Sequence, residues 1–187
     1  MNSIFAREGD EIRVLSLFSG CGGMDFGIES AGGKIVFAND IVENACKTLA
    51  KYFPDTDVKH GDISQIQTFP SVDVVVGGYP CQSFSMAGNR KPSDDARTNL
   101  YKQFLRVLNI VRPKYFVAEN VSGLQQLGAG SFLEQQVNAY RAAGYQVSHH
   151  LVNAKSYGVP QSRKRLFIIG VRNDLGQYFE FPAATHG

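Results

Sequence analysis

Apolar and polar positions along the chain alternate between two regular patterns. Short runs rich in Val, Ile, Leu and Phe are typical of buried strands, and longer stretches between them carry apolar residues at helical spacing. The expected strands are 14–18, 34–38, 72–76, 115–118, 145–152 and 165–171, and the expected helices are 25–31, 43–52, 100–111 and 132–143. Because strands and helices alternate, the pattern predicts an α/β fold with a mostly parallel sheet and helices on both faces.

The composition fits one globular domain spanning residues 1–187. The chain has 187 residues, of which 43% are hydrophobic, and a net charge of +2, which neither requires nor excludes a nucleic-acid partner. No apolar run approaches the roughly 18 residues of a membrane span. The three cysteines are odd in number and scattered, and with the four histidines they do not resemble a zinc site. We expect a cytoplasmic protein without a metal or a membrane partner.

A glycine turn, FSGCGG, follows the first expected strand at residues 18–23. Glycine lets the backbone bend sharply and approach a ligand closely. Asp25 stands where a dinucleotide-binding fingerprint needs a glycine, which disfavours NAD. Asp40 lies 20 positions after Gly20 and ends the second strand, where a carboxylate can accept hydrogen bonds from both hydroxyls of a ribose.

The residues beside and after Asp40 suit an adenine. Ile41 could cover one face of the base, Asp62 could accept a bond from its amino group, and Ile63 could add apolar contact. The alternative is that each Asp only caps the helix that follows it. Together with the glycine turn, however, the acceptors at successive strand ends indicate a nucleoside cofactor bound without a phosphate cradle. That pattern favours S-adenosylmethionine over ATP or NAD.

A cysteine lies on a proline-containing turn just after the strand 72–76, in the sequence GGYPCQSFS. Pro80 restricts its own backbone and that of Tyr79, so Cys81 is expected to point in a defined direction. A lone cysteine is more often a small buried apolar residue. Its place at a strand end near the expected cofactor makes Cys81 a candidate nucleophile.

Three charged residues follow or begin strands near the same edge of the sheet. Glu119 follows the strand 115–118, and its apolar surroundings make it a candidate proton donor. Its alternative role is a helix cap or a structural salt bridge. Arg163 and Arg165 alternate at the start of the last strand and project to the same side. They form either a solvated basic edge or a site for a phosphate or a base oxygen.

Segments in a fixed order resemble the catalytic part of the cytosine-C5 DNA methyltransferases. They are LFSGCGGMDFGIESAG, FANDI, GDI, GGYPCQSFSMAG, DDARTNLYKQFLRVL, FVAENV and NAKSYGVPQSRKRLFIIG, and they span nearly all of residues 13–171. Any one of them could arise by chance, whereas the whole set in the family's order is specific. The resemblance implies the Rossmann-like fold of S-adenosylmethionine-dependent methyltransferases.

The resemblance also implies a role for each candidate residue. Cys81 would be the nucleophile and Glu119 would hold the N3 and amino edge of a cytosine. Arg163 and Arg165 would hold its O2 and nearby phosphates. The residues that would line the S-adenosylmethionine pocket are Phe18, Gly20, Gly23, Asp40, Ile41, Asp62, Ile63, Pro80 and Leu100.

The implied reaction transfers a methyl group to C5 of a cytosine. Addition of the Cys81 thiolate to C6 makes C5 nucleophilic. A base inside a duplex is out of reach, so the cytosine must be flipped out of double-stranded DNA, the expected partner. Gln82, Ser83 and Ser85 would contact the displaced strand and Arg97 its phosphates; a merely solvated loop is the alternative for this stretch.

Other functions remain open at this stage. Some tRNA cytosine-C5 methyltransferases share the architecture, and a non-catalytic cofactor- or DNA-binding module is a further alternative. In the family, a DNA-recognition domain and a returning helix follow a segment like FEFPAATHG. We therefore expect this chain to be an N-terminal fragment, a truncated product or one subunit of a split enzyme, inactive without a second polypeptide. In the last two cases an uncovered apolar face should mark where the returning helix packs. The target DNA sequence is not readable from these residues.

Overall fold

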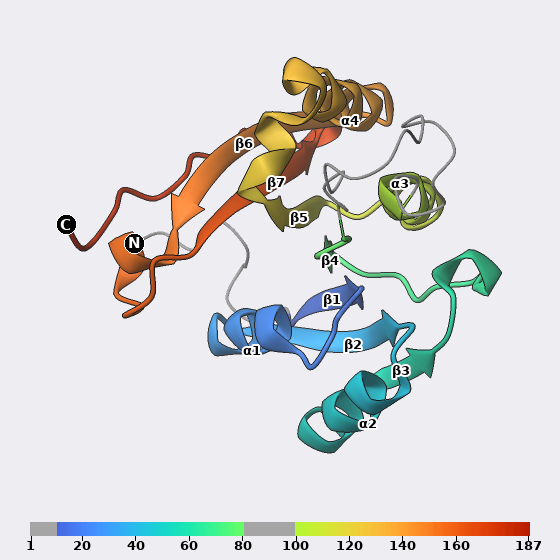
Figure 1. Cartoon of the computed structure of the whole chain (residues 1–187). Helices are drawn as coiled ribbons and strands as arrows, with labels where there is room; N and C mark the ends of the chain where they lie inside the picture. The colour runs from blue at the N-terminus through green and yellow to red at the C-terminus, as the bar shows by residue number, and fades with distance from the viewer. Residues whose placement is uncertain (1–10, 81–99) are drawn as a thin grey trace, which may run out of the picture.

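Seven strands form one sheet in the computed structural model, which describes residues 11–80 and 100–187 (Figure 1). Along the sheet the strands follow the order β3-β2-β1-β4-β5-β7-β6. The strands are β1 (Ile12–Leu17), β2 (Gly33–Asp40), β3 (Asp57–His60), β4 (Val74–Gly77), β5 (Tyr115–Val121), β6 (Tyr145–Asn153) and β7 (Lys164–Arg172). The α-helices are α1 (Gly23–Ser30), α2 (Glu43–Tyr52), α3 (Leu100–Val111) and α4 (Ser131–Ala142).

The sheet is mostly parallel, as the sequence predicts. β1 pairs in parallel with β2 and β4, β2 with β3, and β4 with β5. Only β7 runs antiparallel, between β5 and β6. The reversal arises because residues 154–163 join β6 to β7 through a short 3-10 helix, without the long crossover that a parallel pair requires.

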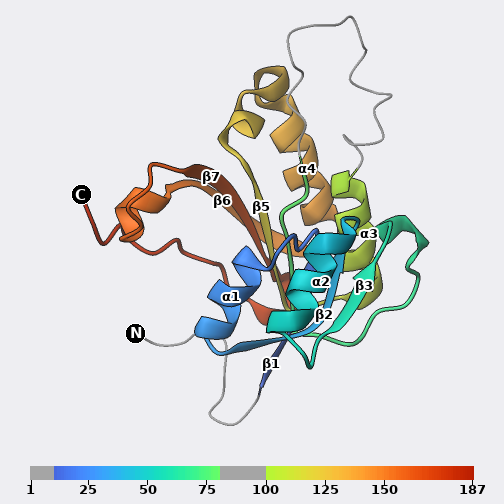
Figure 2. The same ribbon diagram turned by 60° about the horizontal axis from the view of Figure 1, so that its bottom comes forward.

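Helices cover both faces of the sheet, which confirms the expected layers. α1 and α2 lie on one side and α3 and α4 on the other (Figures 1 and 2). Successive residues of β1 alternate between the two sides. Leu15 belongs to the core that contains Phe104 of α3, and Val14 to the core that contains Leu49 of α2. Among the described residues, no helix combines the length and the apolar character needed to cross a membrane.

The expected element boundaries hold best for helices, β3 was not among the expected strands, and β5 is longer than expected. The helices 43–52 and 100–111 coincide with α2 and α3. The strand expected at 115–118 instead continues to Val121, because its antiparallel pairing with β7 runs as far as Val121 opposite Arg165. Glu119 therefore lies inside a strand, and the expectation that it follows the strand end is wrong.

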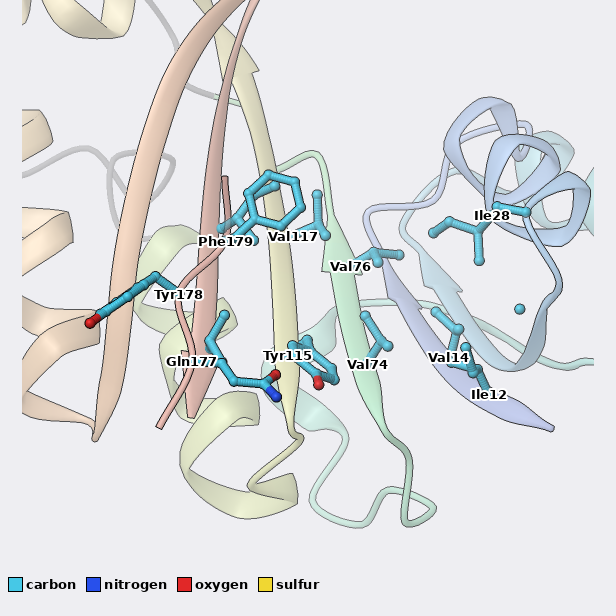
Figure 3. A pocket seen from close by; sticks show the side chains of 14 residues that line it. Ile12, Val14, Ile28, Val74, Val76, Tyr115, Val117, Gln177, Tyr178 and Phe179 are labelled. Carbon is cyan, nitrogen blue, oxygen red and sulfur yellow. The ribbon is translucent and has the colours of Figure 1, made fainter. Parts of the chain in front are cut away.

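An apolar groove of about 220 Å³ lies on the side of the sheet that carries α1 (Figure 3). Val14, Val76 and Val117 come from neighbouring strands, and Ile28 of α1 borders them. Residues 177–179 lie along the same groove. Because Val14 and Val76 are buried, this groove is partly covered and is not a bare apolar surface. The uncovered face expected for a returning helix stays a prediction.

Candidate active site

A cavity of about 550 Å³ lies where the ends of β1 and β4 meet β5 and the beginning of β7. This edge of the sheet contains the carboxyl ends of the parallel strands, the usual place for a ligand in open α/β folds. Five sequence-predicted residues line the cavity: Phe18, Gly23, Glu119, Arg163 and Arg165. The structure thus brings residues from the glycine turn together with the expected base-holding residues.

The glycine turn after β1 has an unusual backbone. Gly20 and Gly22 have positive φ angles of 55° and 88°, and Phe18 adopts φ 54° although it carries a bulky side chain. A non-glycine residue in this region is strained, and such strain is frequent at functional sites. A Cβ atom placed on Gly20 or Gly23 would meet nothing within 4 Å. The turn therefore leaves open space that a ligand can approach closely.

Asp40 ties the glycine turn to the second helix. One carboxylate oxygen accepts a hydrogen bond of 2.8 Å from the Gly20 amide, and the other accepts one of 2.8 Å from the Val42 amide, just before α2. Val42 is the N-cap residue of α2, and no side chain caps this helix, so the structure does not show the capping role weighed for Asp40. Each carboxylate oxygen can accept more than one bond, so acceptor capacity remains for a ribose hydroxyl. Ile41 beside it is 69% exposed.

Asp62 and Ile63 lie on the segment between β3 and β4. The Asp62 carboxylate accepts a 2.8 Å hydrogen bond from the Ser64 amide and caps the short 3-10 helix η1 (Ile63–Gln65). Ile63 is 3% exposed and packs in the core, so its side chain has little surface to offer a ligand. Neither residue lines the cavity described above.

Pro80 and Leu100 stand at the two ends of the stretch that the structure leaves undescribed. Pro80 is exposed, and Leu100 begins α3 and is half-buried. Neither is among the cavity residues. The predicted residues Cys81, Gln82, Ser83, Ser85 and Arg97 lie outside the described residues.

Glu119 and Arg165 form an ion pair on the wall of the cavity. The distance between Arg165 Nε and Glu119 Oε1 is 2.8 Å, and the two side chains are 24% and 23% exposed. Arg165 pairs with Val121, two residues beyond Glu119, so the partners are diagonal neighbours on one face. A structural salt bridge was the alternative role for Glu119, and the structure contains one. A Cβ atom on Gly78 would lie 3.3 Å from Glu119 Oε2, so a glycine there leaves room for the carboxylate.

The turn that leads to Cys81 is anchored by buried hydrogen bonds. Asn120 Nδ2 donates to the Tyr79 carbonyl at 3.0 Å. The Tyr79 hydroxyl donates to Gln136 Oε1 at 2.6 Å and lies 3.0 Å from the Tyr140 hydroxyl. Burial raises the pKa of Tyr140 well above its ordinary value, which keeps that phenol neutral. These contacts hold the residue two positions before Cys81 against both β5 and α4.

Several cavity residues were not singled out from the sequence. Val152, Ala154 and Tyr157, at the end of β6 and just after it, line the cavity, as does Phe167 of β7. Ala154 and Tyr157 belong to the segment NAKSYG, so a signal was present in the resemblance, although it carried no residue role. Phe167 belongs to the same segment, NAKSYGVPQSRKRLFIIG, and so gave the same signal. Val152 gave no such signal, because only the pairing of β6 with β7, which lies beside β5, brings it to the cavity.

Comparisons with known proteins agree with this arrangement. The type II methyltransferase M.BspRI of Lysinibacillus sphaericus is 42% identical to this chain, with 95% of this chain and 49% of that protein aligned. The type II methyltransferase M.AquIA of Picosynechococcus is 43% identical, with 95% and 78% aligned. A solved Escherichia coli structure described as a prophage-encoded DNA modification methyltransferase superposes with a TM-score of 0.79 at 31% identity, covering 91% of this chain and 49% of that one.

The chain spans about half the length of most of the curated relatives it matches, 49% for M.BspRI and 47% for M.NgoFVII of Neisseria gonorrhoeae. The likeness to methyltransferase structures confirms the expected Rossmann-like methyltransferase fold. Residues 12–186 match the C-5 cytosine-specific DNA methylase family. With that match over most of its length and with five of the predicted site residues lining one cavity, the chain belongs to the family of C-5 cytosine-specific DNA methylases.

Proposed function

We propose that this chain is the catalytic region of a DNA cytosine-C5 methyltransferase that uses S-adenosylmethionine. The observation that carries the proposal is the single cavity that joins the open glycine turn to Glu119, Arg163 and Arg165. Cys81 follows β4 closely in the chain, and the end of β4 lines the same cavity. In this proposal the methyl donor and the cytosine bind side by side.

The described residues fit a nucleoside cofactor. Gly20 and Gly23 leave open space, and Asp40 offers a carboxylate held in place by two backbone amides. In this proposal Asp40 accepts hydrogen bonds from the ribose hydroxyls, and Ile41 covers one face of the adenine. Asp62 accepts a hydrogen bond from the amino group of the adenine. The bound cofactor supplies a methyl group on a sulfonium.

Glu119 and Cys81 act on the cytosine. Glu119 holds the N3 and amino edge, and its ion pair with Arg165 fixes the direction of its carboxyl group. The Cys81 thiolate adds to C6, and Glu119 passes a proton to N3, which balances the charge that develops there and leaves the carboxylate that Arg165 stabilises; the proton returns to Glu119 when the ring is restored. C5 then takes the methyl group and loses its proton to solvent, and the Cys81–C6 bond breaks as the C5–C6 double bond re-forms. Arg163 binds O2 of the base or a neighbouring phosphate.

The covalent step is tested with duplex DNA containing 5-fluorocytosine at target positions. Fluorine at C5 cannot leave as a proton does, so an active enzyme stays bound to the DNA through its cysteine. The wild-type chain, supplied with cofactor and any polypeptide needed for DNA binding, is expected to form this denaturation-resistant complex. Cys81→Ala should form none, and the control Cys21→Ala, at an exposed cysteine, should form it normally. Undiminished capture by Cys81→Ala would refute the mechanism.

The cofactor site is tested by calorimetric titration with S-adenosylhomocysteine. Hydrogen bonds to a charged group contribute about 1.5–3 kcal/mol, so Asp40→Ala should raise the Kd by roughly ten- to a hundredfold. Asp57→Ala, at an exposed position in the neighbouring strand β3, is the matched control. An unchanged Kd for Asp40→Ala would remove Asp40 from the site.

Double-stranded DNA is the proposed substrate, in a cytoplasmic restriction–modification setting like that suggested by the relatives' names. Since the chain aligns with about half of M.BspRI, we propose that reading of the target sequence requires a further segment, in the same polypeptide or a second one. Methylation assays with this chain, with and without such a segment, test this division. Sequence-specific methylation of DNA by this chain alone would refute the need for a further segment. Methylation of tRNA in place of DNA would refute the assignment of DNA as the substrate.

A further inference from the structure

Arg106 of α3 makes a set of contacts that the proposed chemistry does not use. Its guanidinium donates from Nη2 to the Ile63 carbonyl at 2.6 Å and from Nη1 to the Ile66 carbonyl at 3.0 Å. Its Nε donates to Gln103 Oε1 at 2.8 Å, on the same helix. The guanidinium carbon also lies 5.9 Å from the centre of the Phe69 ring, within reach of a cation–π interaction.

The contacts with Ile63, Ile66 and Phe69 all reach the same irregular segment, residues 61–73 between β3 and β4. Its regular structure is limited to the three-residue helix η1, so its shape depends on contacts with other elements. Asn39 Nδ2 holds its beginning through the Gly61 carbonyl at 3.0 Å, and Phe69 packs edge-on against Phe37. Arg106 binds the middle, between those two points.

The two bound carbonyls follow Asp62, the residue proposed to meet the adenine amino group, by one and four positions in the chain. Ile63 is the residue whose carbonyl Arg106 binds, and Asp62 precedes it in the chain. The planar guanidinium contacts two carbonyls three residues apart and thereby sets the direction of the intervening turn. Within residues 11–80 and 100–187, no salt bridge joins Arg106 to a carboxylate, and two of its guanidinium nitrogens donate to these main-chain oxygens.

We propose that Arg106 is a positioning residue for the cofactor's adenine: it clamps the segment that carries Asp62 and Ile63 and so sets specificity for the adenine base. The proposal rests on the proposed cofactor site, because it assigns Asp62 to the adenine amino group. Arg106 itself touches neither the cofactor nor the DNA in this proposal. Its effect passes through the backbone of residues 62–66.

The first test measures the clamp without any ligand. The Ser64, Gln65 and Ile66 amides are hydrogen-bonded within the segment, so hydrogen exchange reports its order. Arg106→Met, which keeps the apolar stem, should speed exchange of these amides at least about fivefold. The Phe53 amide, bonded to Leu49 at the end of α2, should exchange as in the wild type. Unchanged exchange in residues 64–66 would overturn the clamp.

The second test compares S-adenosylhomocysteine with its hypoxanthine analogue, in which an oxygen replaces the adenine amino group. If the segment occupies its binding geometry about a tenth of the time in a variant, the Kd for the adenine ligand rises about tenfold. Arg106→Lys, which keeps the charge but not the two-carbonyl geometry, should show this rise and a smaller preference for adenine over hypoxanthine. A general loss of stability would instead raise the Kd for both ligands by the same factor.

The controls separate this inference from the proposed cofactor site. Lys102→Met removes an exposed cation one helical turn earlier on α3 and should change neither exchange nor base preference. Asp40→Ala should weaken both ligands equally and leave the preference as it is. If Asp40→Ala weakens binding but Arg106→Lys keeps the full adenine preference, only the role of Arg106 is refuted. If the wild type binds neither ligand, the proposed cofactor site and the proposed role of Arg106 are both refuted.

Discussion

Asp25, in the first turn of α1, is fully buried, and burial raises its pKa from 3.8 to about 6. The nearby charge of Glu29 acts in the same direction, and the Ser16 hydroxyl opposes them. Neither carboxylate oxygen has a hydrogen bond of normal geometry among the described residues. The charged form is therefore poorly stabilised in the folded protein, and the Asp25→Asn variant isolates its contribution.

The magnitude follows from linkage between proton binding and folding. The folded protein binds this proton more tightly than the unfolded chain, so the stabilisation is present below about pH 4 and is lost as the pH rises through about 6. At 1.36 kcal/mol for each pKa unit, the full effect is about 3 kcal/mol. About 2 kcal/mol of it falls between roughly pH 4.5 and 7.5.

The assay is urea unfolding of the wild type and Asp25→Asn at several pH values across this range. The free energy of unfolding of the wild type should fall relative to that of Asp25→Asn by about 2 kcal/mol as the pH rises. Asp55→Asn removes an exposed carboxylate and controls for the loss of one charge. Parallel curves for the wild type and Asp25→Asn would refute the reasoning, because they would mean that Asp25 titrates alike in both states.

Two further substitutions test the packing behind the cavity. Gly170→Ala would drive a methyl group into the buried Phe116 ring, so it should lower the free energy of unfolding by about 1–3 kcal/mol, measured by urea unfolding. An unchanged unfolding midpoint would contradict this packing. Tyr79→Phe removes the hydroxyl that donates to the buried Gln136 Oε1, so it should lower the free energy of unfolding by about 1–3 kcal/mol. The double variant Tyr79→Phe/Gln136→Leu should recover part of that loss, and strictly additive costs would count against the pair.

The sequence was most informative where local patterns decide the structure. α2 and α3 were predictable because their apolar residues recur at helical spacing, and the glycine turn because its composition permits few alternatives. The full length of β5 was not predictable, since its last residues are held by pairing with β7 and not by local preference. The capping bond of Asp62 could be considered from the sequence, whereas the bond from the Gly20 amide to Asp40, beside an open glycine turn, required the structure.

By itself, then, the sequence determined the α/β class and placed the chemistry-bearing residues near strand ends, because both depend on short-range patterns of apolar residues and turns. Only the tertiary structure decided which of these residues meet. The antiparallel return of β7 beside β5 pairs Arg165 with Glu119, and the packing of α3 beside the segment 61–73 places Arg106 on two of its carbonyls. Such contacts join residues far apart in the chain, so they depend on strand order and register, which no local pattern specifies.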